Sequence, residues 1–478
     1  MADLINLDDS ERMAIGQQVY MWVQAGLATQ GTGPTWWDRI ERFHLNQKPG
    51  GLDVFGFTDA DPKYSKFHVP LSQPRQDALT AQVCTVIGRQ DPYMRDQSDD
   101  EDVAEAKQRV VHRAWNRAGF ESVIRKAARI VGDTDLAYIK IEPGAPGTLD
   151  MFAYHCKNVV VFPALPTGVR SQACIGNRTS RRIAEIEQLR EAKFYYKGQP
   201  VPQNDPTLAQ DRVESDRSGA QYGQMGVDQA TLTSNLWDLD VRLKLEKDGN
   251  EERWYHCTID EQGQLLRLTR SKWSRPRWFR CQFIGSATDY YSATSVGRNL
   301  AGLQDLYNAL WSAMYIGTMR AAVPPMIAPQ STTGEKNLQY SYASYIETAG
   351  KPEAWALTVG FEGGHIPTAL QFIERTADQV ARISQNATGV QTPDTTATES
   401  SIIAAGVAVG LEEFIANFTQ EFGEMAALTC EMIADDYDAF TETCGTEVEM
   451  EDAPATEGID FASLVQGLQT QQMPEVLA

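Results

Sequence analysis

Residues 290–322, YYSATSVGRNLAGLQDLYNALWSAMYIGTMRAA, form the stretch that decides how the rest of the chain is organised. Apolar side chains recur in it at three- and four-residue spacing: Leu300, Leu303, Tyr307, Leu310 and Met314. No proline interrupts the stretch, so the spacing predicts one amphipathic helix of about nine turns. Pro324 and Pro325 follow it, and proline cannot continue a helix, so we expect the helix to end there.

The residues that follow this helix predict a small β insertion and then a returning helix. Residues 323–367 contain five prolines and five glycines, with strand-like patterns at 340–347 and 354–359. Residues 368–387 again place apolar side chains on one helical face. This part of the chain therefore predicts a long helix, a compact β unit and a second helix.

The N-terminal half predicts helices followed by strands. Helical spacing covers residues 10–28, 38–45, 74–87 and 103–131. The period then changes to two, which predicts strands at 137–141, 151–154, 159–162, 236–245, 253–259 and 265–269, the last three as an antiparallel meander. Residues 195–235 are polar and are expected to form a long surface excursion. The fold class is therefore expected to be α+β.

The C-terminal part begins with a loop and continues as a long helix. Residues 385–395, QNATGVQTPDT, are small and polar and include Gly389 and Pro393. Thr396 and Glu399 have the spacing of a capping box, in which each side chain satisfies a free backbone N–H of the first turn. The apolar stripe after it predicts a helix to about Phe440, with Gly406, Gly410 and Gly423 as places for a kink.

Composition predicts a globular protein without a membrane span. The chain has 478 residues, of which 42% are hydrophobic and 22% charged. It contains no run of 18 apolar residues and no signal-peptide pattern at its N-terminus, so neither a membrane span nor secretion is expected. Its seven scattered cysteines favour free thiols in a reducing compartment.

Negative charge is concentrated at the C-terminal end. The formal net charge is -21, and residues 383–478 contain eighteen Asp or Glu and no Lys or Arg. The preceding residues are nearly neutral, with 46 acidic and 43 basic side chains. Binding to a nucleic-acid backbone requires clustered Lys and Arg, so this acidic segment should repel DNA.

Motifs for common catalytic chemistry are absent from the sequence. It has no phosphate-binding loop, HExxH zinc motif, GxSxG elbow or paired CxxC. His155-Cys156 and His256-Cys257 are adjacent pairs, and neighbouring residues on a strand point to opposite faces, so neither pair is expected to share a metal. We therefore expect no catalytic residue, no metal site and no cofactor.

Residues 271–280, SKWSRPRWFR, mix basic and aromatic side chains. Such a segment can bind nucleic acid through phosphate contacts and base stacking, which makes Lys272, Arg275, Arg277 and Arg280 a candidate basic contact patch. The alternative is that these cations pair with acidic groups on a neighbouring surface. The sequence leaves both readings open, with pairing preferred.

The order of elements resembles the portal, or head-to-tail connector, proteins of tailed bacteriophages, particularly those of short-tailed phages. Three short matches carry the resemblance: Arg277-Trp278 before Asp289-Tyr290, the helix RNLAGLQDLYNALW (298–311), and Thr396-Ala397-Thr398-Glu399. The family often has a D-Y-G-R-S-like turn and a T-A-T-E or T-A-E-E helix start at these places. Here the turn lacks Gly-Arg, and the residues before TATE lack the frequent Arg.

The resemblance implies a division of the chain into portal regions. These are an α/β wing (1–285), a first stem helix (286–322), a small β clip (323–367), a second stem helix (368–385), a tunnel loop (386–396), a long wing helix (397–443), and a crown or flexible acidic tail (444–478). The tunnel-loop residues expected near DNA are Asn386, Thr388, Gly389, Gln391, Thr392, Asp394, Thr395 and Thr396.

The resemblance also implies function and partners. Portals form dodecameric rings at one capsid vertex, through which double-stranded DNA is packaged and ejected, and they dock the terminase motor and then the tail. The implied partners are the terminase, the major capsid or scaffolding protein, and tail or adaptor proteins. The implied location is the virion, after assembly in the host cytoplasm. Other hypotheses are a tail or adaptor component, or a metal-dependent nucleic-acid enzyme.

One hypothesis concerns the acidic side chains of the long helix. A conduit for DNA should not hold phosphates, and acidic surfaces repel them. Glu412, Glu413, Glu421, Glu424 and Glu431 are therefore expected to line part of the channel or its rim.

Overall fold

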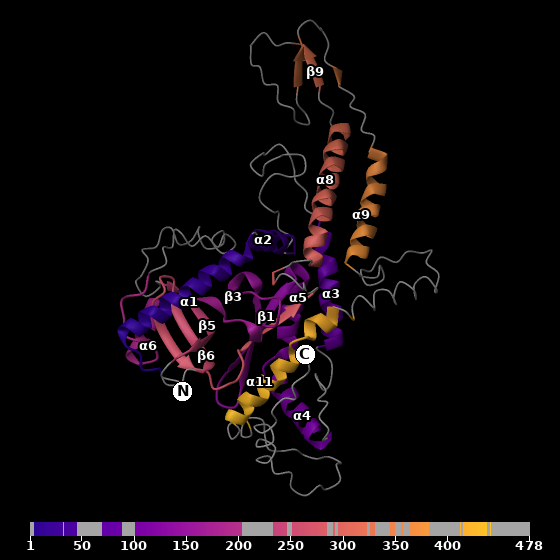
Figure 1. The fold of residues 1–478 in the computed structure, drawn as a ribbon. Coiled ribbons are helices and arrows are strands. Elements are labelled where there is room, and N and C mark those ends of the chain that lie inside the picture. The colour runs from indigo at the N-terminus through magenta and orange to yellow at the C-terminus, as the bar shows by residue number, and fades with distance from the viewer. Residues whose placement is uncertain are drawn as a thin grey trace.

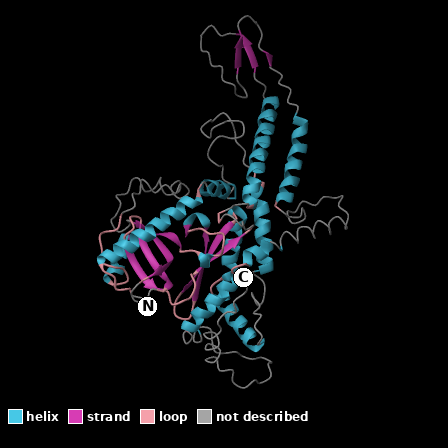
Figure 2. Cartoon of the chain, in the orientation of Figure 1, coloured by secondary structure: helices cyan, strands magenta, loops and turns pink. Residues whose placement is uncertain are grey.

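The computed structural model describes residues 4–31, 33–44, 69–87, 101–202, 233–245, 251–283, 290–291, 295–322, 326–329, 345–348, 355–356, 363–381, 412, 414–436 and 440. Its helices are α1 (Asp9–Gln30), α2 (Gly33–His44), α3 (Ser72–Ile87), α4 (Glu101–Arg117), α5 (Phe120–Thr134), α6 (Ile183–Glu191), α8 (Val296–Ala322), α9 (Ile366–Val380) and α11 (Phe422–Asp435). Its strands are β1 (Leu136–Pro143), β2 (Leu149–His155), β3 (Val159–Phe162), β4 (Cys174–Arg182), β5 (Thr233–Lys244), β6 (Glu252–Asp260), β7 (Leu265–Arg270), β8 (Trp278–Gln282), β9 (Met326–Pro329), β10 (Tyr345–Thr348) and β11 (Trp355–Ala356). Helices and sheets are mixed in the body, in agreement with the expected α+β class (Figure 2).

A five-stranded antiparallel sheet forms one side of the body. Its strand order is β3-β4-β5-β6-β7, and the expected meander of the last three strands is confirmed. Helix α1 packs along β3 and buries Val19 and Val23 against the sheet. A capping box at Asp8 and Glu11 starts α1, with each side chain accepting the other residue's backbone N–H.

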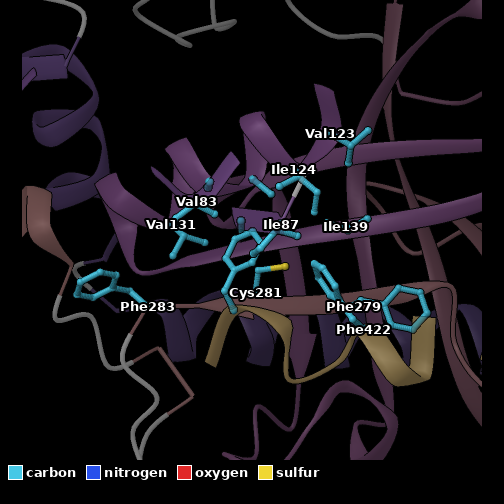
Figure 3. Packing of buried hydrophobic residues seen from close by; sticks show 14 of the residues in the cluster. Val83, Ile87, Val123, Ile124, Val131, Ile139, Phe279, Cys281, Phe283 and Phe422 are labelled. Carbon is cyan, nitrogen blue, oxygen red and sulfur yellow. The ribbon is translucent and has the colours of Figure 1, made fainter. Parts of the chain in front are cut away.

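A second, three-stranded sheet holds the main hydrophobic core. Strand β1 lies between β2 and β8, and both pairings are antiparallel. Apolar side chains from α3, α5, β1, β8 and α11 meet on it, among them Val83, Ile124, Ile139, Phe279 and Phe422 (Figure 3). The core therefore joins the N-terminal helices to the C-terminal helix α11.

Helices α8 and α9 project from this body, and β9 lies at their far end (Figure 1). The third sheet, of order β10-β9-β11, is built from the segment between the two helices. Helix, small β unit and returning helix occur in the expected order. Pro324, Pro325 and the residues beyond Ala381 that were expected to extend the second helix lie outside the described residues.

Helix α8 begins later than the sequence pattern indicated. It starts at Val296, because Ser295 accepts the backbone N–H of Arg298 at 3.0 Å and donates to the Asp133 carbonyl at 2.7 Å. Tyr290 lies before the helix and is buried in the body, where its hydroxyl meets that of Tyr138 at 3.0 Å. Tyr291 packs against the same hydrophobic cluster as Tyr290, so Tyr290 and Tyr291 anchor the chain before α8 to the body.

Three other sequence expectations need correction. The helix expected over 103–131 is two helices, because Gly119 has a φ of 72° and turns the chain between α4 and α5. Strand β4 was not expected at all. The excursion expected over 195–235 begins with buried residues, Tyr195, Tyr196 and Val201, and ends in β5.

The long C-terminal helix is also interrupted. Residues 414–419 are helical, residues 420 and 421 form a turn, and α11 then begins at Phe422. The break lies beside Gly423, one of the positions where a kink was expected. The capping-box residues Thr396 and Glu399 lie outside the described residues.

Candidate functional site

The projecting pair of helices is held together by apolar packing and by a short hydrogen bond between described residues. The Tyr307 hydroxyl of α8 donates to Glu374 Oε1 of α9 at 2.5 Å. Leu300 and Tyr307 are buried in the same cluster as Leu370, Ile373 and Ala377 of α9. Thus α9 packs against the apolar stripe that the sequence identified on α8.

The remaining residues predicted for stem packing contribute less burial. Leu303 and Leu310 are partly buried and pack against the same cluster, while Met314, nearer the far end, is also partly buried. Leu306 of α8 and Phe372 of α9 are exposed to solvent over 43% and 70% of their surface, respectively. The pair therefore has one apolar face directed inward and large apolar side chains directed outward.

The base of the projection is tied to the body by residues that the sequence analysis did not identify. Gln304 Oε1 accepts the backbone N–H groups of Leu71 and Ser72 at 2.8 and 3.0 Å, and its Nε2 donates to the Val69 carbonyl at 2.7 Å. One buried carboxamide thus satisfies three backbone groups at the start of α3. No sequence motif signals this role.

A buried ion pair joins α3 to α9. Arg75 Nη2 lies 2.6 Å from Asp378 Oδ1, and each side chain is 9% exposed. Burial raises the pKa of Asp378, and the Arg75 guanidinium opposes that rise. Because Arg75 also donates to the Glu374 carbonyl at 3.1 Å, α3 is bound to two successive turns of α9. Helices α8 and α9 are therefore both fixed at their bases to α3.

The basic-aromatic segment 271–280 faces α11 and its start. Lys272 pairs with Asp435 at 2.6 Å, and Arg275 pairs with Glu424 at 2.5 Å and Glu431 at 3.1 Å. Glu421 accepts the backbone N–H of Arg280 at 2.6 Å. The cations of this segment therefore contact carboxylates of the same chain, which is the pairing alternative considered above.

These contacts also place three of the five acidic residues expected at a channel. Glu421, Glu424 and Glu431 all engage residues 274–280. Glu421 is enclosed where the helix breaks, and burial raises its pKa although backbone N–H groups of Arg280 and Val169 oppose that rise. Glu412 is exposed, and the side chain of Glu413 lies outside the described residues.

Arg277 belongs to a buried ionic network between the two body sheets. Its guanidinium donates to Asp240 Oδ1 at 2.6 Å and to Glu142 Oε1 at 2.9 Å. The second cation of the network is Lys140, whose Nζ lies 2.8 Å from Asp238 and 2.7 Å from Glu142. Burial raises the pKa of Asp240, but the cation of Arg277 and the contact with His256 outweigh it and hold that pKa well below its usual range. The network keeps these groups charged inside the body.

No grouping of three or more metal-binding side chains occurs within the part of the chain that the structure describes. His155 and Cys156 contact each other at 3.7 Å, and His256 is hydrogen-bonded to Asp240 at 2.8 Å. Among the described helices, none is both long and apolar enough to cross a membrane.

Every residue assigned to the tunnel loop lies outside the described residues. These are Asn386, Thr388, Gly389, Gln391, Thr392, Asp394, Thr395 and Thr396. Their expected proximity to DNA stays a prediction.

No family model matches the chain, and no curated protein matches it.

Proposed function

We propose that this protein is a portal subunit of a tailed bacteriophage. A ring of such subunits would occupy one vertex of the capsid, pass double-stranded DNA during packaging and ejection, and dock first the terminase motor and then the tail. In this proposal the body is the wing, α8 and α9 are the stem, and the β9–β11 sheet is the clip.

One observation carries the proposal. Two helices project side by side from an α/β body and support a small sheet at their far end (Figure 1). Such a projection exposes a large surface for few residues, and α8 and α9 keep Leu306 and Phe372 exposed on it. Side chains of this size on a projecting helix pair favour assembly with other subunits.

The ionic contacts of residues 271–280 fit the same proposal. A conduit has to let a polyanion slide past, and cations paired with internal carboxylates offer few phosphate contacts. Arg275 has two carboxylate partners and Arg277 is buried, so these cations are unsuited to grip DNA. They serve instead to hold α11 and the two body sheets in place.

The direct test is the size and shape of the purified protein. Negative-stain images should show rings with a central hole, and mass photometry should give a particle of twelve 53.1 kDa chains. A protein that stays monomeric over the whole accessible concentration range, or that forms open filaments, would contradict the proposal. Nuclease activity dependent on a divalent metal would favour the enzyme hypothesis instead.

A further inference from the structure

The break in the C-terminal helix is not explained by the residues that form it. The helix over 414–419 stops at a turn of residues 420 and 421, and α11 starts at Phe422. The sequence FIANFTQEF (414–422) contains neither proline nor glycine, the usual causes of a sharp kink. Gly423 follows the break and lies on α11, where an added methyl group would meet nothing within 4 Å. A cause outside the helix is therefore required.

The apolar pattern continues through the break without a shift. Phe414, Phe418, Phe422 and Met425 follow one another at three- and four-residue spacing, which is the spacing of one helical face. All four side chains are buried in the main hydrophobic core. A continuous helix over 414–435 would place the same side chains on the core, so packing alone does not require the break.

Helical hydrogen bonds of the main chain are given up at the break. The Gln420 N–H reaches the Asn417 carbonyl, three residues back, at 3.4 Å, and four-residue bonding resumes where the Met425 N–H donates to the Glu421 carbonyl at 3.0 Å. A continuous helix would supply four-residue bonds to the N–H groups between these two points. Other contacts must therefore offset the bonds that the broken form lacks.

The carboxylate of Glu421 provides such contacts, because it binds two other elements. Its Oε2 accepts the Arg280 N–H of β8 at 2.6 Å, and its Oε1 accepts the Val169 N–H of η2 (Val169–Ser171) at 3.2 Å. The Glu421 side chain is 12% exposed, and hydrogen bonds to a charged acceptor are stronger than neutral ones. Gly168 leaves room for this approach, since a methyl group there would lie 3.0 Å from Glu421 Oε1.

The bond to Arg280 also covers a sheet edge. Strand β8 is the last strand in the described order β2-β1-β8, and an unpaired strand edge presents free N–H and C=O groups. Glu421 takes the Arg280 N–H, and Asn417 Nδ2 donates to the carbonyl of Phe283, just beyond β8, at 3.2 Å. The side chains of Asn417 and Glu421 thus take part of the place of a further strand.

We propose that Glu421 is a latch that holds the helix in its broken form. While its carboxylate holds the N–H groups of Arg280 and Val169, residues 420 and 421 stay outside the helix. When the carboxylate lets go, residues 414–435 join into one helix. The latch couples the helix before the break to the edge of β8, so a displacement of one is passed to the other. This proposal goes beyond the portal assignment and does not depend on it.

Amide hydrogen exchange of the full chain, read residue by residue by mass spectrometry, tests the latch. Glu421→Leu removes the carboxylate and keeps a good helix former. The N–H groups of residues 421–424 should then exchange about tenfold more slowly, because they gain helical bonds, while the N–H groups of Arg280 and Val169 should exchange about tenfold faster. A simple loss of stability would speed exchange at all of these positions. That result, or unchanged exchange, would overturn the proposal.

Two further variants keep the test decisive where Glu421→Leu folds poorly. Gly168→Ala crowds Glu421 Oε1 without changing residue 421, and it should shift the same N–H groups in the same directions by about threefold. Gly423→Ala is the matched control: it leaves the carboxylate in place, so exchange of the Arg280 N–H should equal that of wild type. Unchanged exchange in Gly168→Ala, or a Gly423→Ala variant that behaves as Glu421→Leu should, would show that Glu421 does not set the break.

Discussion

His155 shows how one side chain links the fold to pH. Its Nδ1 accepts the backbone N–H of Lys157 at 3.1 Å and starts the 3₁₀ turn η1 (Cys156–Asn158). Burial and the neighbouring Lys157 ammonium lower the pKa of His155 from 6.5 to about 4. The unfolded chain therefore binds a proton more readily between these values, and the folded state loses stability as pH falls through that window.

We predict that His155→Asn reduces this pH dependence. Asparagine keeps an acceptor for the Lys157 N–H but does not titrate, so the variant should lose less stability than wild type between pH 7 and pH 4.5, by at most about 3 kcal/mol. The measurement is the urea midpoint at pH 7, 5.5 and 4.5. His365→Asn, which replaces an exposed histidine, is the control and should follow wild type. The same acid sensitivity in all three proteins would rule out this role.

The buried pair of Arg277 and Asp240 predicts a different kind of residue effect. Arg277→Met leaves the Asp240 carboxylate inside the body without its main cation, which should lower the free energy of unfolding by about 3–5 kcal/mol. The double variant R277M/D240N removes both charges and should recover much of that loss. Chemical denaturation at pH 7 measures both.

The matched control for this prediction is a surface pair. Arg181 and Glu185 are both exposed and pair at 3.0 Å, so Arg181→Met should change the free energy of unfolding by less than about 1 kcal/mol. If Arg277→Met were as mild as Arg181→Met, the buried network would have no structural role.

Among the elements, the contact between α1 and β3 depends on a glycine. A methyl group on Gly26 would lie 2.6 Å from Val160 Cγ2 and 2.7 Å from the Val161 carbonyl oxygen. We predict that Gly26→Ala pushes α1 off the sheet and costs about 1–3 kcal/mol. Gly302→Ala on α8 meets nothing within 4 Å and should stabilise its helix by up to about 1 kcal/mol. Thermal melting of both variants measures the difference, and two shifts of the same sign would contradict it.

The elements also show where sequence patterns are sufficient. The three-four spacing of Leu300, Leu303 and Tyr307 located α8 because one of its faces is buried. The same pattern placed the start of α8 too early. Tyr290 is apolar, as a residue on the buried face of a helix would be, but it packs into the body before α8 begins. The spacing of apolar residues also predicted one helix where the structure has α4 and α5. The left-handed turn at Gly119 separates the two helices but does not interrupt the apolar pattern. Strand β4 was missed because its second half, from Arg178 on, is polar and partly exposed.

For the whole molecule, the main prediction concerns assembly. Phe372 on α9 is 70% exposed, and in a ring of projecting helix pairs it would be covered by a neighbouring subunit. Phe372→Ser should therefore raise the concentration needed for ring formation by at least tenfold and leave the melting temperature of the single chain unchanged. Mass photometry over a dilution series measures this. Met13→Ser, a change of an exposed residue on α1, is the control, and equal effects of the two would contradict a specific role for α9.

The sequence by itself determined the mixture of helices and strands, the helix–sheet–helix order of residues 296–380, and the excess of acid in the last hundred residues. These features follow from local periodicity and composition, which need no knowledge of distant contacts. Only the tertiary structure decided that Arg275 faces Glu424 and Glu431, and that Gln304 holds the start of α3. The physical reason is that pairing and exposure depend on residues far apart in the chain, and no spacing rule encodes which distant partner a charged side chain will meet.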